Sequence, residues 1–131
     1  MPEYFFDIEY NDITFEEKEL NLKEFECCTF SNCNFSKCIF VAITFIDCTF
    51  NNCIFSDAKI NYAAFRSVIF NDCEIKDVNF AMCDKLIFEI TFNNCILDFS
   101  KFYTLKIKRT SFTNCSLVAV DFMNTNLTEV V

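Results

Sequence analysis

The sequence predicts an all-β fold, a solenoid whose coils each hold about twenty residues and have four sides. Three observations predict it. A phenylalanine, leucine or isoleucine occupies every fifth position from Leu20 to Phe80, and again from Ile87 to Leu127. Small or apolar residues precede these central residues by two positions. Closely similar segments also return about every twenty residues.

The period of five excludes a helix and a flat strand. Five steps along an α-helix rotate a side chain by about 500°, so the central residues would scatter around the helix. Five steps along a flat strand put successive central residues on opposite faces. The pattern therefore requires a chain that turns once per repeat, so that each short extended piece points its central side chain at a common axis.

A second column of residues fixes the direction of the side chains. Positions two apart share a face of an extended segment, so the residue two before each central one also points inward. This column consists of small or apolar residues: Cys28, Cys33, Cys38, Ile43, Cys48, Cys53, Ala58, Ala63, Val68, Cys73, Val78 and Cys83. The other three residues of each repeat are mostly polar and are expected to face water.

Near copies of one segment give the length of a coil. Thr29–Cys33, Thr49–Cys53, Ile69–Cys73, Thr91–Cys95 and Ser111–Cys115 begin 20, 20, 22 and 20 residues apart. A face that returns every four repeats implies a four-sided coil, with like residues stacked at a strand spacing of about 4.8 Å.

The repeats Asn32-Cys33-Asn34-Phe35-Ser36 and Asn52-Cys53-Ile54-Phe55-Ser56 resemble those of the pentapeptide-repeat family. The resemblance covers residues 20–131 and implies a right-handed quadrilateral parallel β-helix, here with five to six coils. The Cys-rich, Phe-centred style with one two-residue slip is most similar to the branch of the Qnr quinolone-resistance and microcin-immunity proteins. Proteins of that branch are thought to present an acidic, DNA-shaped rod to DNA gyrase or topoisomerase IV.

Two domains follow from the pattern. Residues 1–19 are expected to form an N-terminal cap or an irregular first coil, because Ile8 and Ile13 replace the small inward residues. Residues 20–131 are expected to form a single β-helix. No cap pattern follows the last repeat before Val131, so we expect either a homodimer through the C-terminal coils or a chain that continues further.

The ten cysteines are interpreted as core residues. Most lie on the inward column, where free cysteine acts as a small apolar side chain, and the ladder Cys33, Cys53, Cys73, Cys95 and Cys115 is expected to stack. Five-residue spacing without histidine does not fit a zinc site, and a cytosolic chain disfavours disulfides. No metal or other cofactor is expected. Cys27 departs from the column and is the expected exposed thiol.

The chain contains no glycine, so its turns must use other residues. Asn and Asp best tolerate the left-handed region, and the column Asn32, Asn52, Asp72, Asn94 and Asn114 is expected to supply it. The same column also fits a hydrogen-bonded ladder of side chains across the coils.

Two departures from the pattern mark candidate binding surfaces. The repeat gains two residues near 81–88, and the candidate bulge contains Asp84, Lys85, Leu86 and Phe88. Phe88 is expected to pack over this bulge. The other departure is the face built on the central residues Leu20, Phe40, Ile60, Phe80, Phe102 and Phe122. Its outward residues are unusually apolar and form a candidate interaction surface: Leu22, Ile39, Val41, Tyr62, Met82, Tyr103 and Met123.

The charge is concentrated at one end of the chain. Residues 1–26 hold nine acidic and two basic residues, a net charge of −7, whereas residues 27–131 hold ten acidic and nine basic residues, a net charge of −1. Lys106, Lys108 and Arg109 form a local basic corner. DNA carries one charge per about 1.7 Å, so most of the rod is a poor electrostatic copy of it.

The sequence predicts a non-enzymatic protein that acts by contact with other proteins. There is no histidine, no glycine-rich phosphate loop and no pair of acidic residues singled out by the pattern. The N-terminus is acidic and no apolar run reaches about 18 residues, which predicts a cytoplasmic protein without membrane or direct nucleic-acid contact. Protection of DNA gyrase or topoisomerase IV and a scaffold with an unrelated partner remain as two hypotheses.

Overall fold

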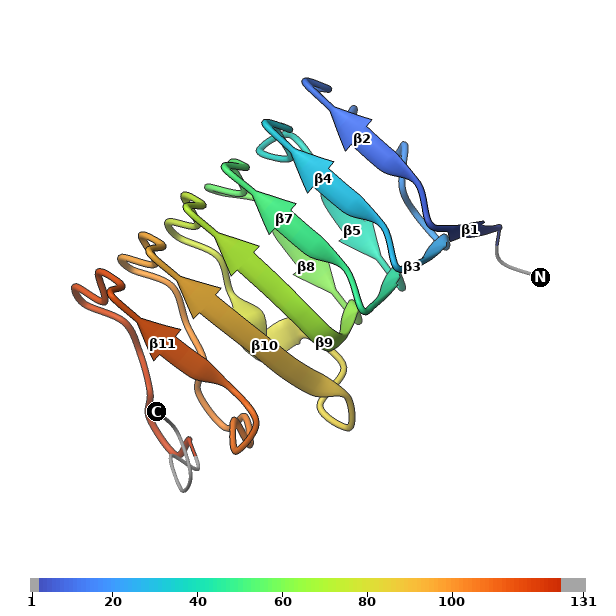
Figure 1. Cartoon of the computed structure of the whole chain (residues 1–131). Helices are drawn as coiled ribbons and strands as arrows, with labels where there is room; N and C mark the ends of the chain where they lie inside the picture. The colour runs from blue at the N-terminus through green and yellow to red at the C-terminus, as the bar shows by residue number, and fades with distance from the viewer. Residues whose placement is uncertain (1–2, 126–131) are drawn as a thin grey trace.

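The computed structural model describes residues 3–125, which form one stack of coils (Figure 1). Its strands are short because each occupies one side of a coil. They are β1 (Tyr4–Phe6), β2 (Glu9–Asn11), β3 (Glu24–Glu26), β4 (Thr29–Ser31), β5 (Ile39–Val41), β6 (Thr44–Ile46), β7 (Thr49–Asn51), β8 (Lys59–Asn61), β9 (Ala64–Asn71), β10 (Phe88–Asn93) and β11 (Ser111–Thr113). One turn of 3₁₀ helix, η1 (Phe80–Met82), interrupts them.

Parallel pairing between successive coils confirms the four-sided coil of about twenty residues. The β1 side consists of β1, β3, β6 and the starts of β9 and β10, and the β2 side consists of β2, β4, β7, the ends of β9 and β10, and β11. The third side, here the Asn34 side, is held by single bridges from Thr14 through Asn34 to Ser116. The β5 side contains β5, β8 and the bridges Asn79 to Lys101 and Lys101 to Asp121.

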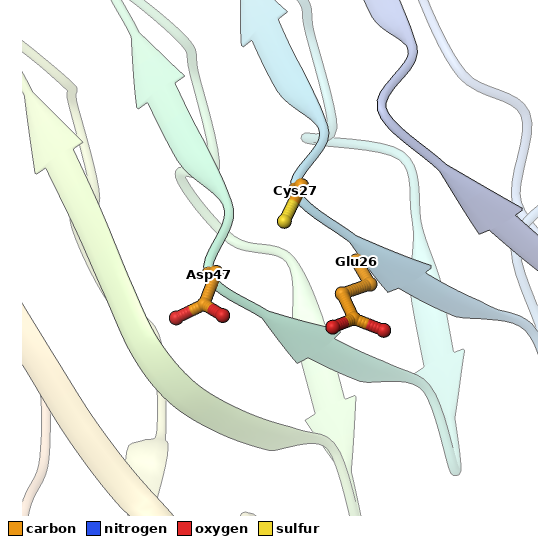
Figure 2. Close-up of side chains that lie close together, drawn as sticks. All are labelled: Glu26, Cys27 and Asp47. Carbon is orange, nitrogen blue, oxygen red and sulfur yellow. The ribbon is translucent and has the colours of Figure 1, made fainter.

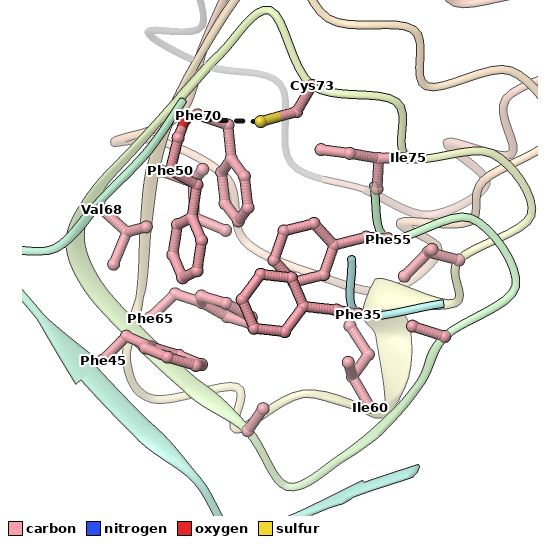
Figure 3. Packing of buried hydrophobic residues seen from close by; sticks show 14 of the residues in the cluster. Phe35, Phe45, Phe50, Phe55, Ile60, Phe65, Val68, Phe70, Cys73 and Ile75 are labelled. Carbon is pink, nitrogen blue, oxygen red and sulfur yellow. Dashed lines mark hydrogen bonds between the residues drawn. The ribbon is translucent and has the colours of Figure 1, made fainter. Parts of the chain in front are cut away.

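The central residues fill the axis of the stack with aromatic rings (Figure 3). Phe30 and Phe50 lie one coil apart with ring centroids 4.9 Å apart and planes within 9°, and Phe50 and Phe70 repeat this geometry at 4.7 Å. Rings from neighbouring sides meet edge to face, as Phe35 and Phe50 do at 75°. Both geometries are favourable for aromatic pairs, so the stacked rings stabilise the packing of each coil on the next.

The inward cysteines belong to the core, as the sequence predicts. All ten cysteines are free, and those of the inward column are buried except for the half-buried Cys115. Cys53 Sγ donates to the carbonyl of Phe30 at 3.3 Å, and Cys73 Sγ donates to that of Phe50 at 3.4 Å. A thiol therefore fills a small space and also contacts the previous coil. Burial raises the pKa of Cys48 to about 12, so this thiol stays protonated.

Residues with positive φ make the corners. The predicted column Asn32, Asn52, Asp72, Asn94 and Asn114 has φ between 51° and 55°. Asn52 Nδ2 also donates to Asn32 Oδ1 at 2.7 Å, so this pair makes both the turn and the ladder. The same conformation recurs at equivalent corners on the other sides, where it falls on residues that tolerate it less well, including Leu22, Tyr62 and Phe99.

The insertion differs in detail from the predicted pattern. The prediction of Ile87 as a central residue is wrong: Phe88 pairs with Phe65 and is buried, while Ile87 is half-buried. The register between β9 and β10 then shifts between Phe88 and Ile90, so that Phe92 again pairs with Phe70, 22 residues earlier. Relative to the offset of twenty between coils, three residues are therefore inserted before Phe88 and one is removed between Phe88 and Ile90. The larger aromatic ring, and not Ile87, takes the core position.

Residues 3–19 form a coil in the regular register. Tyr4 pairs with Glu24, Glu9 pairs with Thr29 and Thr14 bridges to Asn34, each 20 residues apart. In this first coil of the described residues the side chains that pack against the core are half-buried, among them Phe5, Ile8 and Ile13. The predictions that concern Leu127 and Val131 lie outside the described residues. Within residues 3–125 no helix is long and apolar enough to cross a membrane.

Candidate interaction surface

One exposed apolar side chain from each of six successive coils lies along one edge of the β5 side. We name Leu22, Val41, Tyr62, Met82, Tyr103 and Met123 the corner strip. All are exposed except Tyr103, which is half-buried. Backbone hydrogen bonds join two pairs of its members: the N–H of Leu22 donates to the carbonyl of Val41 at 3.1 Å, and that of Tyr62 donates to the carbonyl of Met82 at 2.8 Å. The strip therefore has one member on each coil along the rod.

Ile39 belongs to the same side but not to the strip. It is half-buried at the start of β5 and pairs with Lys59, whereas Val41 at the end of β5 is exposed. The structure thus brings together six of the seven predicted surface residues, all except Ile39. A hollow of about 430 Å³ lies between Tyr62, Met82 and Lys85, where the strip meets the inserted loop.

The backbone at Tyr62 makes this residue unusual. Its φ is 59° and its side chain is 71% exposed, the highest value in the strip. The left-handed conformation is unfavourable for a bulky side chain and is easier for Asn or Asp. Most corners of the β2 side indeed use Asn or Asp. Because burial does not account for Tyr62, its ring is a candidate contact for a partner.

The inserted loop places the predicted bulge residues at different depths. Leu86 projects from it with 95% of its surface exposed, and its N–H donates to Asp84 Oδ1 at 2.9 Å. Lys85 Nζ donates to Thr104 Oγ1 at 3.1 Å, which ties the loop to the next coil. Phe88, by contrast, does not lie over the bulge but in the core.

The loop also meets the basic corner, which sequence analysis treated as a separate feature. Lys85 and Leu86 line one hollow together with Lys106, Lys108 and Arg109. The connection follows from the solenoid register, because Phe65, Phe88 and Ile107 occupy successive positions on the β1 side. An alignment of the sequence coil by coil would place the inserted loop next to these three basic residues.

A second cluster lies at the acidic end of the β1 side (Figure 2). Glu26, Cys27 and Asp47 offer one ligand atom each within 4.8 Å of one another. Cys27 and Asp47 are exposed corner residues of successive coils. Desolvation and the carboxylates of Glu26, Asp47 and Asp7 raise the pKa of the Cys27 thiol. The predicted exposed thiol is confirmed, and its surroundings oppose ionisation.

Comparisons with known proteins agree on the fold. No protein-family model and no curated protein matches the chain. Among solved structures, a trypsin-treated form of QnrB1, a plasmid-mediated fluoroquinolone resistance protein, overlays with a TM-score of 0.62 at 14% identity, covering 99% of this chain and 74% of that one. Rfr23, a pentapeptide-repeat protein from the cyanobacterium Cyanothece 51142, overlays with a TM-score of 0.33 at 9% identity, covering 98% and 84%.

The fold of this chain is the four-sided parallel β-helix that pentapeptide-repeat proteins adopt. Its five-residue period, its four-sided coils and its overlay with a trypsin-treated form of QnrB1 all agree on this. Within the class, the solenoid is similar to that of QnrB1.

Proposed function

We propose that this protein is a non-enzymatic interaction module that binds a partner protein through the corner strip. The length of the strip carries the proposal: every coil from the first to the sixth contributes one apolar side chain to one edge, and five of the six side chains are exposed. A row of exposed apolar side chains along one edge is typical of interaction sites on soluble proteins. The Tyr62 ring, held in an unfavourable backbone conformation, is the expected centre of the contact.

The absence of catalytic function is part of the proposal. Phenylalanine rings fill the axis of the stack, so no interior cavity is left in residues 3–125 for a substrate to enter. The hollows lie on the outer walls, and catalysis depends on converging groups in a partly dry site. A surface that binds a protein needs neither.

A type II topoisomerase is the specific partner that we propose. The similarity of the solenoid to that of QnrB1 favours it, as does the resemblance of the repeats to the Qnr branch. The charge distribution argues for a contact different from a uniform imitation of DNA. The described acidic residues gather on the first two coils, while the β2 side is lined by uncharged residues such as Thr49, Asn51 and Asn71. Apolar contacts along the strip would then carry the affinity.

A supercoiling assay tests the topoisomerase. Purified protein is added to DNA gyrase with a fluoroquinolone, and direct binding is measured by interferometry. We expect restored supercoiling and measurable binding. The double variant Tyr62→Glu/Tyr103→Glu should lose both, because two charges on the strip oppose desolvation. Absence of protection together with absence of binding to gyrase and topoisomerase IV would reject these partners.

The strip itself is tested separately, by affinity capture from the native cell. Proteins retained by the unaltered chain but not by Tyr62→Glu/Tyr103→Glu are its partners. Ile54→Glu/Ile96→Glu is the matched control, because both isoleucines are exposed on the Asn34 side. A partner lost equally from both double variants would count against the strip. Retention by both would remove the strip from the interaction.

A further inference from the structure

A second concave surface lies on the β1 side near the last coil described. A hollow of about 480 Å³ is lined by four basic side chains, and by Leu86, Phe88, Glu89 and Thr104. The basic residues are Lys85, Lys106, Lys108 and Arg109. We name this hollow the basic pocket. Lys85 also lines the hollow beside Tyr62 and Met82, so the pocket adjoins the corner strip at the inserted loop. Its cations come from two segments of the chain that the coil register brings together.

The charges in the basic pocket are mostly uncompensated. Arg109 Nη1 lies 3.9 Å from Glu89 Oε1, and the Arg109 side chain remains 76% exposed. Among residues 3–125, Glu89 is the only carboxylate that lines the pocket. Lys85 contacts the neutral hydroxyl of Thr104 at 3.1 Å. The lining residues thus carry four cations and one anion. Asp84, whose carboxylate accepts from the N–H of Leu86, lowers the local excess to two positive charges on a chain whose net charge is −8.

An apolar group stands at the rim of the same pocket. Leu86 is almost fully exposed, whereas the neighbouring Phe88 is buried beneath the loop. A leucine exposed to this degree contributes nothing to the core, and covering it on binding would be favourable. The pocket thus combines a cationic floor with one apolar contact. A free inorganic anion would pair with the cations but would not cover Leu86.

The acidic end of the rod does not cancel this local charge. Glu24 and Glu26 lie on the second coil, and the pocket lies on the fifth and sixth coils. With about 4.8 Å per coil, they are separated by roughly 15–20 Å, which is twice the Debye length of about 8 Å at physiological salt. A short ligand therefore experiences mainly the cations. A long polyanion that extends along the rod would also meet the carboxylates.

We propose that the basic pocket binds a short acidic segment of a partner protein that carries an apolar side chain next to its carboxylates. The carboxylates pair with Lys106, Lys108 and Arg109, and the apolar side chain covers Leu86. This chemistry explains why the insertion projects a leucine beside cations. The pocket and the strip meet at Lys85, which lines both the basic pocket and the hollow beside Tyr62 and Met82.

Fluorescence anisotropy with a labelled peptide tests the site. The probe is Glu-Glu-Leu-Glu-Glu, with Gln-Gln-Leu-Gln-Gln and Glu-Glu-Ser-Glu-Glu as comparisons. We expect a Kd of about 10–100 μM at low salt for the first peptide, weakening several-fold at 0.3 M salt. The glutamine peptide should not bind, and the serine peptide should bind about three- to tenfold more weakly.

Variants locate the peptide. Lys106→Glu/Lys108→Glu should weaken binding at least tenfold, whereas Lys37→Glu/Lys59→Glu, the same charge change on other sides, should change it less than twofold. Leu86→Ser should weaken the leucine peptide but leave the serine peptide unchanged, a readout that a folding defect cannot produce. Circular dichroism confirms that each variant folds. Equal loss with both double variants would overturn the proposal.

A polyanion is the competing ligand. Single-stranded DNA and inorganic polyphosphate are titrated under the same conditions. Binding of either without binding of the acidic peptide would show a nucleic-acid or phosphate site and overturn the proposal. Binding of the peptide that DNA does not displace supports it. No binding of any probe also overturns it.

Discussion

The hydroxyl of Ser100 donates a 2.7 Å hydrogen bond to the carbonyl of Ile75, whereas the buried hydroxyl of Thr110 has no partner within residues 3–125. Both residues occupy the inward column, where the other coils place Cys, Ala, Val or Ile. Ser100 also accepts a hydrogen bond from the N–H of Val78 at 3.1 Å. A buried hydroxyl therefore makes hydrogen bonds at Ser100 and makes none at Thr110 within the described residues.

Thr110→Val is expected to stabilise the protein. Valine keeps the shape and removes a buried polar atom without a partner, which is worth about 1 kcal/mol in the free energy of unfolding. Ser100→Ala should instead destabilise by about 1–3 kcal/mol, because it leaves the backbone of Val78 without its acceptor. Urea denaturation of both variants measures this. A loss of stability in Thr110→Val would show that its hydroxyl has a partner in solution.

Phe88→Ala should be far more damaging than Ile87→Ala. Phe88 fills a core position opposite Phe65, so its removal should cost about 3–5 kcal/mol, while the half-buried Ile87 should cost about 1 kcal/mol. Thermal unfolding followed by circular dichroism compares the two. Equal losses, or a larger loss for Ile87→Ala, would contradict the register found between β9 and β10.

Tyr62→Asn is expected to raise stability by about 0.5–1 kcal/mol, because asparagine adopts the left-handed conformation more easily than tyrosine. Tyr103→Asn is the matched control: Tyr103 lies in the same strip but does not have positive φ, so no gain is expected. Denaturant midpoints give the comparison. If both variants lose stability, the Tyr62 ring contributes to the fold and not only to binding.

The reactivity of Cys27 should depend on its acidic neighbours. Desolvation and then the carboxylates of Glu26 and Asp47 raise its pKa, so less reactive thiolate is present at a given pH than for an unperturbed cysteine. Glu26→Gln/Asp47→Asn should lower this pKa and speed alkylation at pH 8 by about two- to fivefold, an effect that salt reduces. Iodoacetamide labelling followed by mass spectrometry measures the rate. A rate unchanged in the double variant would leave desolvation as the sole cause.

The column pattern predicts the core of this fold well because each position has a distinct steric requirement. Cys53 and Phe55 lie where the five-residue period puts them, and Asn52 turns the chain as its residue type suggests. The five-residue period does not predict which residue of the insertion enters the core. Ile87 and Phe88 both suit a central position, and only packing against Phe65 and Phe80 in three dimensions favours the larger ring.

The candidate surfaces could be predicted only in part. Tyr62 and Met82 are recognisable as outward residues because the period assigns them a direction. Leu86 and Lys108 belong to different coils, and nothing in their local sequence indicates that they line one hollow. Their proximity depends on how the inserted loop leaves the coil, which a periodic pattern does not describe.

Pairing at a constant offset of twenty residues makes the rod modular in length. Phe25 meets Phe45 as Phe45 meets Phe65, so each coil offers its neighbours nearly the same surface. Removing residues 34–53 would join Cys33 to Ile54 and leave every column continuous. Such a chain would be shorter by about 4.8 Å and would keep the basic pocket, while the corner strip would lose one side chain. The spacing between two binding surfaces can thus change in fixed steps during evolution without redesign of the core.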